Sequence, residues 1–247
     1  MADGLTKEES GSYDPNHPFA GRDPRMAMTI IYPGMDWNGT VVNTLDKTIN
    51  GKDNANYPPS ANNASKTALT WRKYLDEQYA NGIWNTNACP IVIRYAEVLL
   101  TYAEAVNELS GPSADVYDKL DLIRGRVGMP KVDREKYASK ETLRRLIRRE
   151  RGVELAGEGV RRADILRWKD DNGKMVAETV LNGVLERVVG TVNYAETDPT
   201  KRAEIDTNAP ATDKKIEDRV FKVHNRYNPI PQGAIDNNPN LEQNPGY

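Results

Sequence analysis

Two glutamates able to do acid–base chemistry lie in the most highly charged stretch of the chain, residues 149–168. Glu154 and Glu158 are the kind of pair that a glycoside hydrolase uses as general acid and nucleophile on either side of a sugar bond. Residues four apart on one helix face the same way, however, so this pair cannot flank a substrate. Neighbouring arginines would also keep both carboxylates ionised, whereas a general acid must hold a proton. The stretch therefore predicts a network of ion pairs.

The expected network braces packed helices and contains one carboxylate in an unusual place. Glu150 falls four residues after Leu146 and three before Val153, in line with the apolar stripe of a helix. A carboxylate buried there has to be paired with a cation, because an uncompensated buried charge is strongly destabilising. The residues expected to form these structural ion pairs are Arg25, Glu150, Arg151, Glu154, Glu158, Arg162 and Asp164.

An Arg-Asp-Pro-Arg run near the start of the chain, from Arg22 to Arg25, offers two more guanidinium groups. Pro24 disfavours helical backbone at Asp23, and each arginine can fork onto carboxylates or carbonyls. Two interpretations remain open. The run is either a clamp on packed helices, which is favoured, or a site for a phosphate or carboxylate ligand.

Composition excludes several classes of function. The 34 basic and 36 acidic residues leave a net charge of −2, which does not favour nucleic acid or an anionic membrane as a partner. A single cysteine, Cys89, cannot form an intrachain disulfide and is expected to be at least partly buried. Two distant histidines, His17 and His224, do not have the spacing of a metal site. No phosphate-binding glycine loop or nucleophile elbow is present, so the sequence predicts no cofactor.

Targeting segments are also missing from the sequence. It contains no apolar run long enough to span a membrane, and its first ten residues are too polar for the core of a signal peptide.

The first third of the chain, residues 1–88, is interrupted by prolines, asparagines and glycines, which favour loops and short extended segments. Short strands are predicted over Ala27–Tyr32 and Gly39–Leu45. A weak helical pattern covers Thr67–Tyr79.

The next hundred residues carry helical periodicity. A helix is predicted from Pro90 to Leu109, followed by one that Ser113 caps and that ends at Gly128. The short link predicts an antiparallel helix pair. Further helices are expected from Ser139 to about Gly159, over 160–169 and over 174–184, and the chain is expected to be irregular from Gly190. The stripe of the first helix is Val92, Ala96, Leu99, Ala103 and Val106, flanked by Tyr95, Tyr102 and Leu109.

Four segments together resemble the C-terminal half of the SusD/RagB family: Arg22–Arg25, Arg94–Glu108, Arg149–Trp168 and Tyr227–Tyr247. The sequence departs from the family pattern at Gly152 and Gly157. The resemblance implies a mainly α-helical SusD-like domain with a tetratricopeptide-like helix pair and long irregular loops. It also implies that residues 1–247 are the C-terminal portion of such a domain, with a loop-rich ligand side over 1–88, a helical scaffold over 89–189 and a C-terminal strap over 190–247.

The same resemblance implies a function. Members of the family are outer-membrane lipoproteins, exposed at the cell surface, that capture oligosaccharides or related nutrients without catalysis. They deliver these to a TonB-dependent transporter of the SusC type. The lipid anchor requires an N-terminal cysteine, which is expected in an upstream half outside this sequence. The alternative is a helical-repeat scaffold that binds only protein.

Candidate ligand contacts come from aromatic residues in the loop-rich third, since a pyranose stacks on an aromatic ring while its hydroxyls bind polar side chains. Trp71 and Trp168 are predicted to pack in the protein instead. The expected ligand-binding residues are Tyr32, Trp37, Asn38, Trp84 and Asn85.

Overall fold

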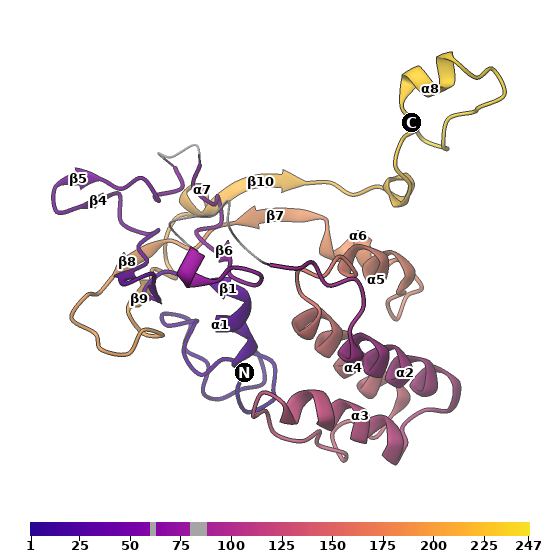
Figure 1. Cartoon of the computed structure of the whole chain (residues 1–247), viewed down its shortest axis with the longest axis horizontal. Coiled ribbons are helices and arrows are strands. Elements are labelled where there is room, and N and C mark those ends of the chain that lie inside the picture. Colours follow the sequence, from indigo (N-terminus) through magenta and orange to yellow (C-terminus); the bar gives the residue numbers. More distant parts are fainter. Residues whose placement is uncertain (60–62, 80–87) are drawn as a thin grey trace. The chain divides into compact units, whose positions relative to one another are not determined.

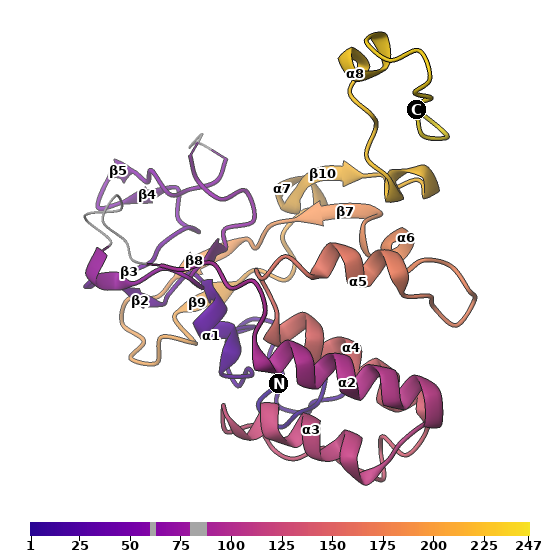
Figure 2. The ribbon, with the colours of Figure 1, turned by 45° about the vertical axis from the view of Figure 1, so that its right-hand side comes forward.

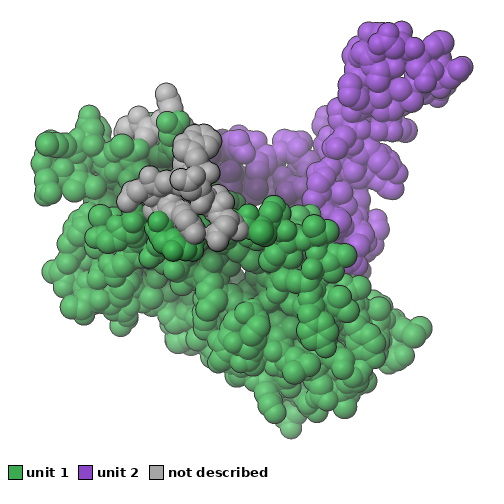
Figure 3. All heavy atoms as spheres, in the orientation of Figure 1, with its two compact units in different colours: residues 1–160, 187–214 green, residues 161–186, 215–247 purple. Residues whose placement is uncertain are grey.

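The computed structural model describes residues 1–59, 63–79 and 88–247. The chain forms two compact units, coloured separately in Figure 3. The first contains residues 1–160 and 187–214, and the second contains residues 161–186 and 215–247. The expected C-terminal strap, 190–247, is therefore divided between the two units.

Three helices make the helical part of the first unit: α2 (Tyr95–Ser110), α3 (Ala114–Gly125) and α4 (Lys140–Glu154). They lie side by side in Figure 1 and in the rotated view of Figure 2, and α2 contacts both of the others. Their core contains Tyr117 and Tyr137 together with aliphatic side chains that have almost no exposed surface, among them Leu100, Leu120, Leu143, Leu146 and Ile147.

Side-chain caps begin two of these helices. The hydroxyl of Ser113 accepts a hydrogen bond from the Val116 amide (3.3 Å), as the sequence predicts for α3. Ser139 and Thr142 form a reciprocal capping box at the start of α4, with the Thr142 amide 3.1 Å from Ser139 Oγ.

Two helix ends differ from the prediction. The α2 helix begins at Tyr95 and not at Pro90, because Arg94 is extended (φ −137°). The α4 helix ends at Glu154 and not near Gly159; Gly157 and Gly159 follow with φ of 77° and 82°, a conformation outside the α-helical region.

The α2 helix is apolar on two sides. Leu99, Leu100 and Ala103 are buried in the core, whereas Val92 precedes the helix and is 86% exposed. The flanking side chains Tyr95, Tyr102 and Leu109 are also exposed. The predicted stripe is therefore correct for its central part and wrong at Val92.

The loop-rich part of the first unit is built from short elements, which are α1 (Arg25–Thr29), β1 (Ile30–Ile31), β2 (Asp36–Trp37), β3 (Thr40–Val41), β4 (Thr48–Ile49), β5 (Lys52–Asp53), β6 (Thr70–Trp71), η1 (Glu77–Tyr79), β8 (Gly190–Val192), β9 (Ala203–Ile205) and α7 (Ala211–Lys214). The strands pair antiparallel as β1–β6, β2–β3, β4–β5 and β8–β9. Phe19, Ile31, Tyr32, Met35 and Leu45 belong to the core that these elements enclose. The helical pattern over Thr67–Tyr79 was misleading, since the segment contains β6, a turn and one 3₁₀ turn.

Two of the hairpins turn at an Asn-Gly pair. Asn38 and Gly39 have φ of 50° and 73°, and Asn50 and Gly51 have φ of 51° and 76°. Positive φ at both central residues is the requirement of the tight turn that matches strand twist, and Asn-Gly satisfies it best.

The second unit contains α5 (Arg161–Arg167), α6 (Val176–Val180), β7 (Gly183–Glu186), β10 (Lys215–Arg219), η3 (Val223–Arg226) and α8 (Gln232–Asp236). Strands β7 and β10 pair antiparallel, and Ile165, Met175, Ala177 and Phe221 form the core. Among the described residues of both units, no helix has the length and apolar character needed to span a membrane.

Gly190 tests the tight β8–β9 pairing. A Cβ on Gly190 would lie 2.1 Å from the carbonyl oxygen of Glu204, so we expect Gly190→Ala to destabilise the protein by about 1–3 kcal/mol in urea denaturation. Gly125→Ala is the matched control, because a Cβ there meets nothing within 4 Å and alanine favours the helix. Equal denaturation midpoints for the two variants would contradict the β8–β9 packing.

Candidate functional site

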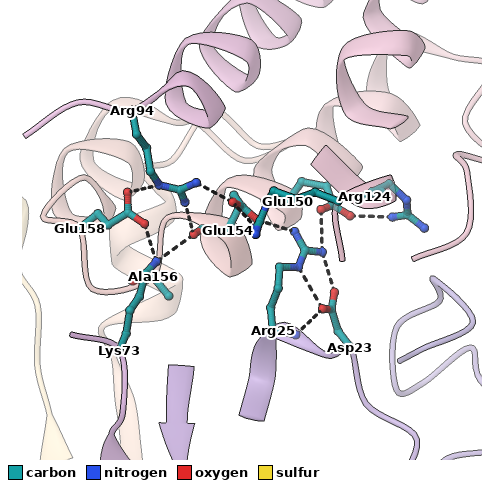
Figure 4. A network of polar contacts seen from close by, with 10 residues as sticks. Asp23, Arg25, Lys73, Arg94, Arg124, Glu150, Glu154, Ala156 and Glu158 are labelled. Carbon is teal, nitrogen blue, oxygen red and sulfur yellow. Dashed lines mark hydrogen bonds and ion pairs between the residues drawn. The ribbon is translucent and has the colours of Figure 1, made fainter. Parts of the chain in front are cut away.

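Three glutamates spaced four residues apart lie along the last turns of α4 and the turn that follows the helix. Glu150, Glu154 and Glu158 have side chains that are 3%, 1% and 3% exposed. Figure 4 shows cations reaching them from several segments that are distant in sequence. We call this cluster the carboxylate ladder, and its cationic partners are Arg25, Lys73, Arg94, Arg124 and Arg126.

Arg25 connects α1 to the ladder. Its Nη2 lies 2.9 Å from Glu150 and its Nη1 lies 3.1 Å from Glu154, while Asp23 holds the other edge of the guanidinium at 2.6 Å. Arg124 of α3 binds the second oxygen of Glu150 at 2.6 Å. The carboxylate in the apolar stripe is thus paired from two sides.

Arg94 and Lys73 connect the start of α2 and the segment after β6 to the same end of α4. Arg94 binds Glu154 at 2.6 Å and Glu158 at 2.7 Å, and it also donates to the Glu154 carbonyl. Lys73 donates to the carbonyls of Glu154 and Ala156 and pairs with Glu158. These cations satisfy the carbonyls that a helix C-terminus leaves without an intrahelical partner.

The protonation of the ladder follows from its partners. Burial raises the pKa of the Glu154 and Glu158 carboxyls, but hydrogen bonds from Arg94, joined by Arg25 for Glu154 and Lys73 for Glu158, outweigh it and hold both pKa values below the ordinary range. Both groups are therefore carboxylates at neutral pH. This arrangement does not suit a general acid, which has to carry a proton.

The remaining residues expected in ion pairs lie elsewhere. Arg151 contacts Glu104 of α2 at 3.6 Å. In the second unit Asp164 pairs with Arg167 at 2.7 Å, whereas Arg162 donates hydrogen bonds to the Asn225 carbonyl and to Asn228. For Arg162 the structure thus gives neutral acceptors in place of the expected carboxylate.

Lys73, Arg124 and Arg126 were not predicted to belong to the network. Their ladder partners are 85, 26 and 28 residues away in sequence. Helical spacing relates only residues three or four apart, so it contained no information about these pairs.

The expected ligand residues have different environments. Tyr32 is 3% exposed and its ring stacks on Phe19 with centroids 4.7 Å apart, so it is a core side chain and has no free face for a ligand. Trp37 is half-buried beneath the guanidinium of Arg72, 5.2 Å from the ring centroid. Asn38 is exposed in the β2–β3 turn. Trp84 and Asn85 lie outside the described residues.

Trp71 was expected to pack but is 54% exposed. Strand pairing with Ile30 fixes its backbone, and Gly157 lies against its ring, since a Cβ on Gly157 would be 3.4 Å from the indole. Gly157, one of the two positions where the sequence departs from the family pattern, therefore leaves room for the Trp71 ring. Trp168, also expected to pack, is 3% exposed.

Trp71 borders a pocket of about 480 Å³, which we call the Trp71 pocket. Its other lining residues are Ile30, Ser65, Thr67, Leu69 and Thr70. The wall thus combines an exposed aromatic ring with three hydroxyl side chains, a composition suited to stacking and hydrogen bonding of a polar ring.

Cys89, expected to be at least partly buried, is exposed.

Comparison with known proteins identifies what the chain resembles. A model of the SusD family matches residues 1–247. A SusD-like protein from Formosa agariphila is 34% identical over 154 residues, which are 58% of this chain and 29% of that protein. A SusD-like carbohydrate binding protein from Bacteroides fragilis superposes with a TM-score of 0.73 at 31% identity, over 98% of this chain and 46% of that one.

A second SusD-like structure from Bacteroides fragilis has a TM-score of 0.71 at 25% identity, over 100% of this chain and 44% of that one. The chain therefore spans less than half the length of these relatives. The predicted SusD-like, mainly α-helical fold is confirmed.

The ladder predicts a severe effect of losing Glu150. Glu150→Ala leaves Arg25 and Arg124, both 4% exposed, without their shared carboxylate, so we expect a loss of about 3–5 kcal/mol in the free energy of unfolding. Glu141→Ala, at an exposed position in the first turn of the same helix, should cost less than about 1 kcal/mol. Thermal melts within a degree or two of the parent for Glu150→Ala would refute a structural role.

The lowered pKa of Glu154 predicts an acid-sensitive contribution. Its stabilisation is complete above the ordinary pKa of 4.5 and is lost as pH falls through that value toward the folded-state pKa. Glu154→Gln should therefore be less stable than the parent at pH 7. The gap should narrow at pH 4 and further below it, because the unfolded-state carboxyl takes up its proton near 4.5 and the folded-state carboxyl does so only at lower pH. Urea denaturation at both pH values measures the gap. A gap that does not change with pH would show that the Glu154 charge is not the stabilising feature.

Proposed function

Since the chain belongs to the SusD family, we propose that it contributes to non-catalytic capture of an oligosaccharide or related nutrient at the cell surface. The observation that carries this proposal is the exposed Trp71 ring beside the hydroxyls of Ser65, Thr67 and Thr70. The similar protein from Bacteroides fragilis is described as a carbohydrate binding protein, which supports a sugar as the ligand class.

The environment of Trp71 suits repeated binding of a sugar ring. The β1–β6 pairing fixes the Trp71 backbone and Gly157 lies against the indole, so part of the ordering cost of binding is already met in the free protein. The exposed surface of the indole provides an apolar face. The Ser65 and Thr67 hydroxyls donate to the Leu69 carbonyl and can still accept from a sugar hydroxyl, whereas the Thr70 hydroxyl can both donate and accept. Trp37 and Asn38 at the β2–β3 hairpin, and Trp84 and Asn85, are proposed as further contacts.

Delivery and location are proposed from family membership alone. In this proposal the ligand passes to a SusC-like TonB-dependent transporter in the outer membrane. The protein is held at the cell surface as a lipoprotein.

A protein-binding helical scaffold is the second candidate function. The exposed side chains Tyr95, Val98 and Tyr102 on α2 favour it, because they form an apolar face suited to a partner helix. Such a scaffold would bind no glycan.

Calorimetric titration against a panel of neutral and acidic polysaccharides and oligosaccharides separates the two candidates. For a glycan that binds, Trp71→Ala should weaken binding about tenfold or more, because the stacking surface is removed. Tyr95→Ala is the matched control, since it removes an exposed aromatic ring from the α2 scaffold. It should leave the affinity unchanged.

Two results would contradict the proposal. One is a panel without any binding glycan. The other is a glycan whose affinity falls for Tyr95→Ala and not for Trp71→Ala. Circular dichroism of each variant checks that the fold is retained.

A further inference from the structure

A second pocket of the first unit shares only Ile30 with the Trp71 pocket. It lies between residues 4–7, the start of α1 and the last turns of α4, and its volume of about 400 Å³ is in the range of small-molecule sites. We call it the Arg22–Arg149 pocket. Its apolar wall includes Leu5, Met26, Ile30, Met129 and Val153.

The two carboxylates on the wall of this pocket are already paired. Asp23 binds Arg25 at 2.6 Å, and Glu150 binds Arg25 and Arg124 at 2.9 and 2.6 Å. Figure 4 shows these four side chains engaged with one another. They therefore leave no carboxylate to neutralise other cations that face the pocket.

Two arginines on the wall have no carboxylate partner among the described residues. Arg22 contacts Met1 Sδ at 3.3 Å and lies 5.7 Å from the centroid of the Tyr13 ring. Arg149 donates to the Gly4 carbonyl at 3.0 Å and to the Tyr137 hydroxyl at 3.1 Å, both neutral acceptors. Lys7, also on the wall, lies 3.7 Å from the carboxylate of the exposed Glu8.

The pocket therefore combines an excess of positive charge with an apolar wall. The uncharged polar side chains on the wall are Thr6 and Thr29. Because arginine and lysine offer hydrogen-bond donors and no acceptor, donors predominate on this wall and favour an acceptor-rich ligand over a neutral sugar. An anion is favoured because a carboxylate accepts the forked donors of a guanidinium and neutralises it in a partly desolvated site.

We propose that the Arg22–Arg149 pocket binds a small organic carboxylate with a compact apolar body. The carboxylate is bound by Arg22 and Arg149, and the body packs against Met26, Ile30 and Val153. This site is independent of the glycan site proposed at Trp71. The two arginines of the Arg-Asp-Pro-Arg run then have different roles. Arg25 pairs with Glu150 and Glu154 of the ladder, whereas Arg22 lines the pocket and binds the ligand.

The probe for this site is 3-phenylpropanoate, compared with its uncharged amide and with glucuronate. Titration calorimetry at pH 7 should give a Kd of about 1 mM or tighter for the acid and an affinity at least about tenfold weaker for the amide. Glucuronate carries the same charge on a polar body and should bind more weakly than 3-phenylpropanoate. Bound acid should also raise the melting temperature, because it binds only the folded protein.

Arg22→Gln tests the charge directly. Arg22 contacts Met1 and the Tyr13 ring and has no ion pair with any described residue, so its loss should leave the fold intact. We expect about tenfold weaker binding of 3-phenylpropanoate, which corresponds to about 1.4 kcal/mol. Arg134→Gln is the control, because Arg134 is an exposed arginine of the same unit outside the pocket. It should bind the acid as the parent does.

Lys7→Gln provides a second variant at an exposed position, and it should weaken binding by a smaller factor. The proposal is overturned if the acid fails to bind, if the amide binds equally well, or if glucuronate binds more tightly than 3-phenylpropanoate. Unchanged affinity in Arg22→Gln would overturn it as well. None of these results depends on whether a glycan binds at Trp71.

Discussion

The structure of the first unit depends on neutralising three buried carboxylates at one end of α4. Glu150, Glu154 and Glu158 lie four residues apart, and each carries a charge that cannot remain unpaired in a desolvated site. Their partners come from α1, from the segment after β6, from the residue before α2 and from α3. The ladder thus specifies how the loop-rich part packs on the helices. Ion pairs of this kind add little net stability compared with apolar packing, but a wrong arrangement leaves charges buried and costs several kcal/mol.

The same constraint positions the candidate ligand site. Lys73 follows Trp71 by two residues and donates to the carbonyls of Glu154 and Ala156. The segment that continues from the strand of Trp71 is therefore bonded to the carboxylate ladder. Gly157, between Glu154 and Glu158, then provides the flat surface against which the indole rests. Residues 154–158 therefore contact both the cations of the ladder and the ring that is proposed to bind glycan. A ring with restricted motion and an exposed surface is what a sugar-binding platform requires.

Patterns local in sequence predicted the helices and the position of Glu150, because spacings of three and four residues place side chains on one helix face. These local patterns gave wrong predictions where a side chain packs against residues that are far away in the sequence. Tyr32 lies in the loop-rich third of the chain and was expected to meet ligand, yet it packs on Phe19 in a core assembled from segments far apart in sequence. Trp71 was expected to pack and is exposed. Its neighbours Ile30 and Gly157 are also remote in sequence, so the local pattern contained no information about its surroundings. The Asn-Gly pairs at Asn38 and Asn50 are local sequence signals that favour the β2–β3 and β4–β5 hairpins.

The most direct test of this account is a double-mutant cycle between Arg25 and Glu150, whose charged atoms are 2.9 Å apart in a buried site. The variants are Arg25→Gln, Glu150→Gln and the pair, with the free energy of unfolding measured by urea denaturation. If the carboxylate ladder specifies the packing, the double variant will be more stable than the sum of the single losses predicts, with a coupling energy of about 1.5 kcal/mol or more. Additive losses, with a coupling below about 0.5 kcal/mol, would contradict the account.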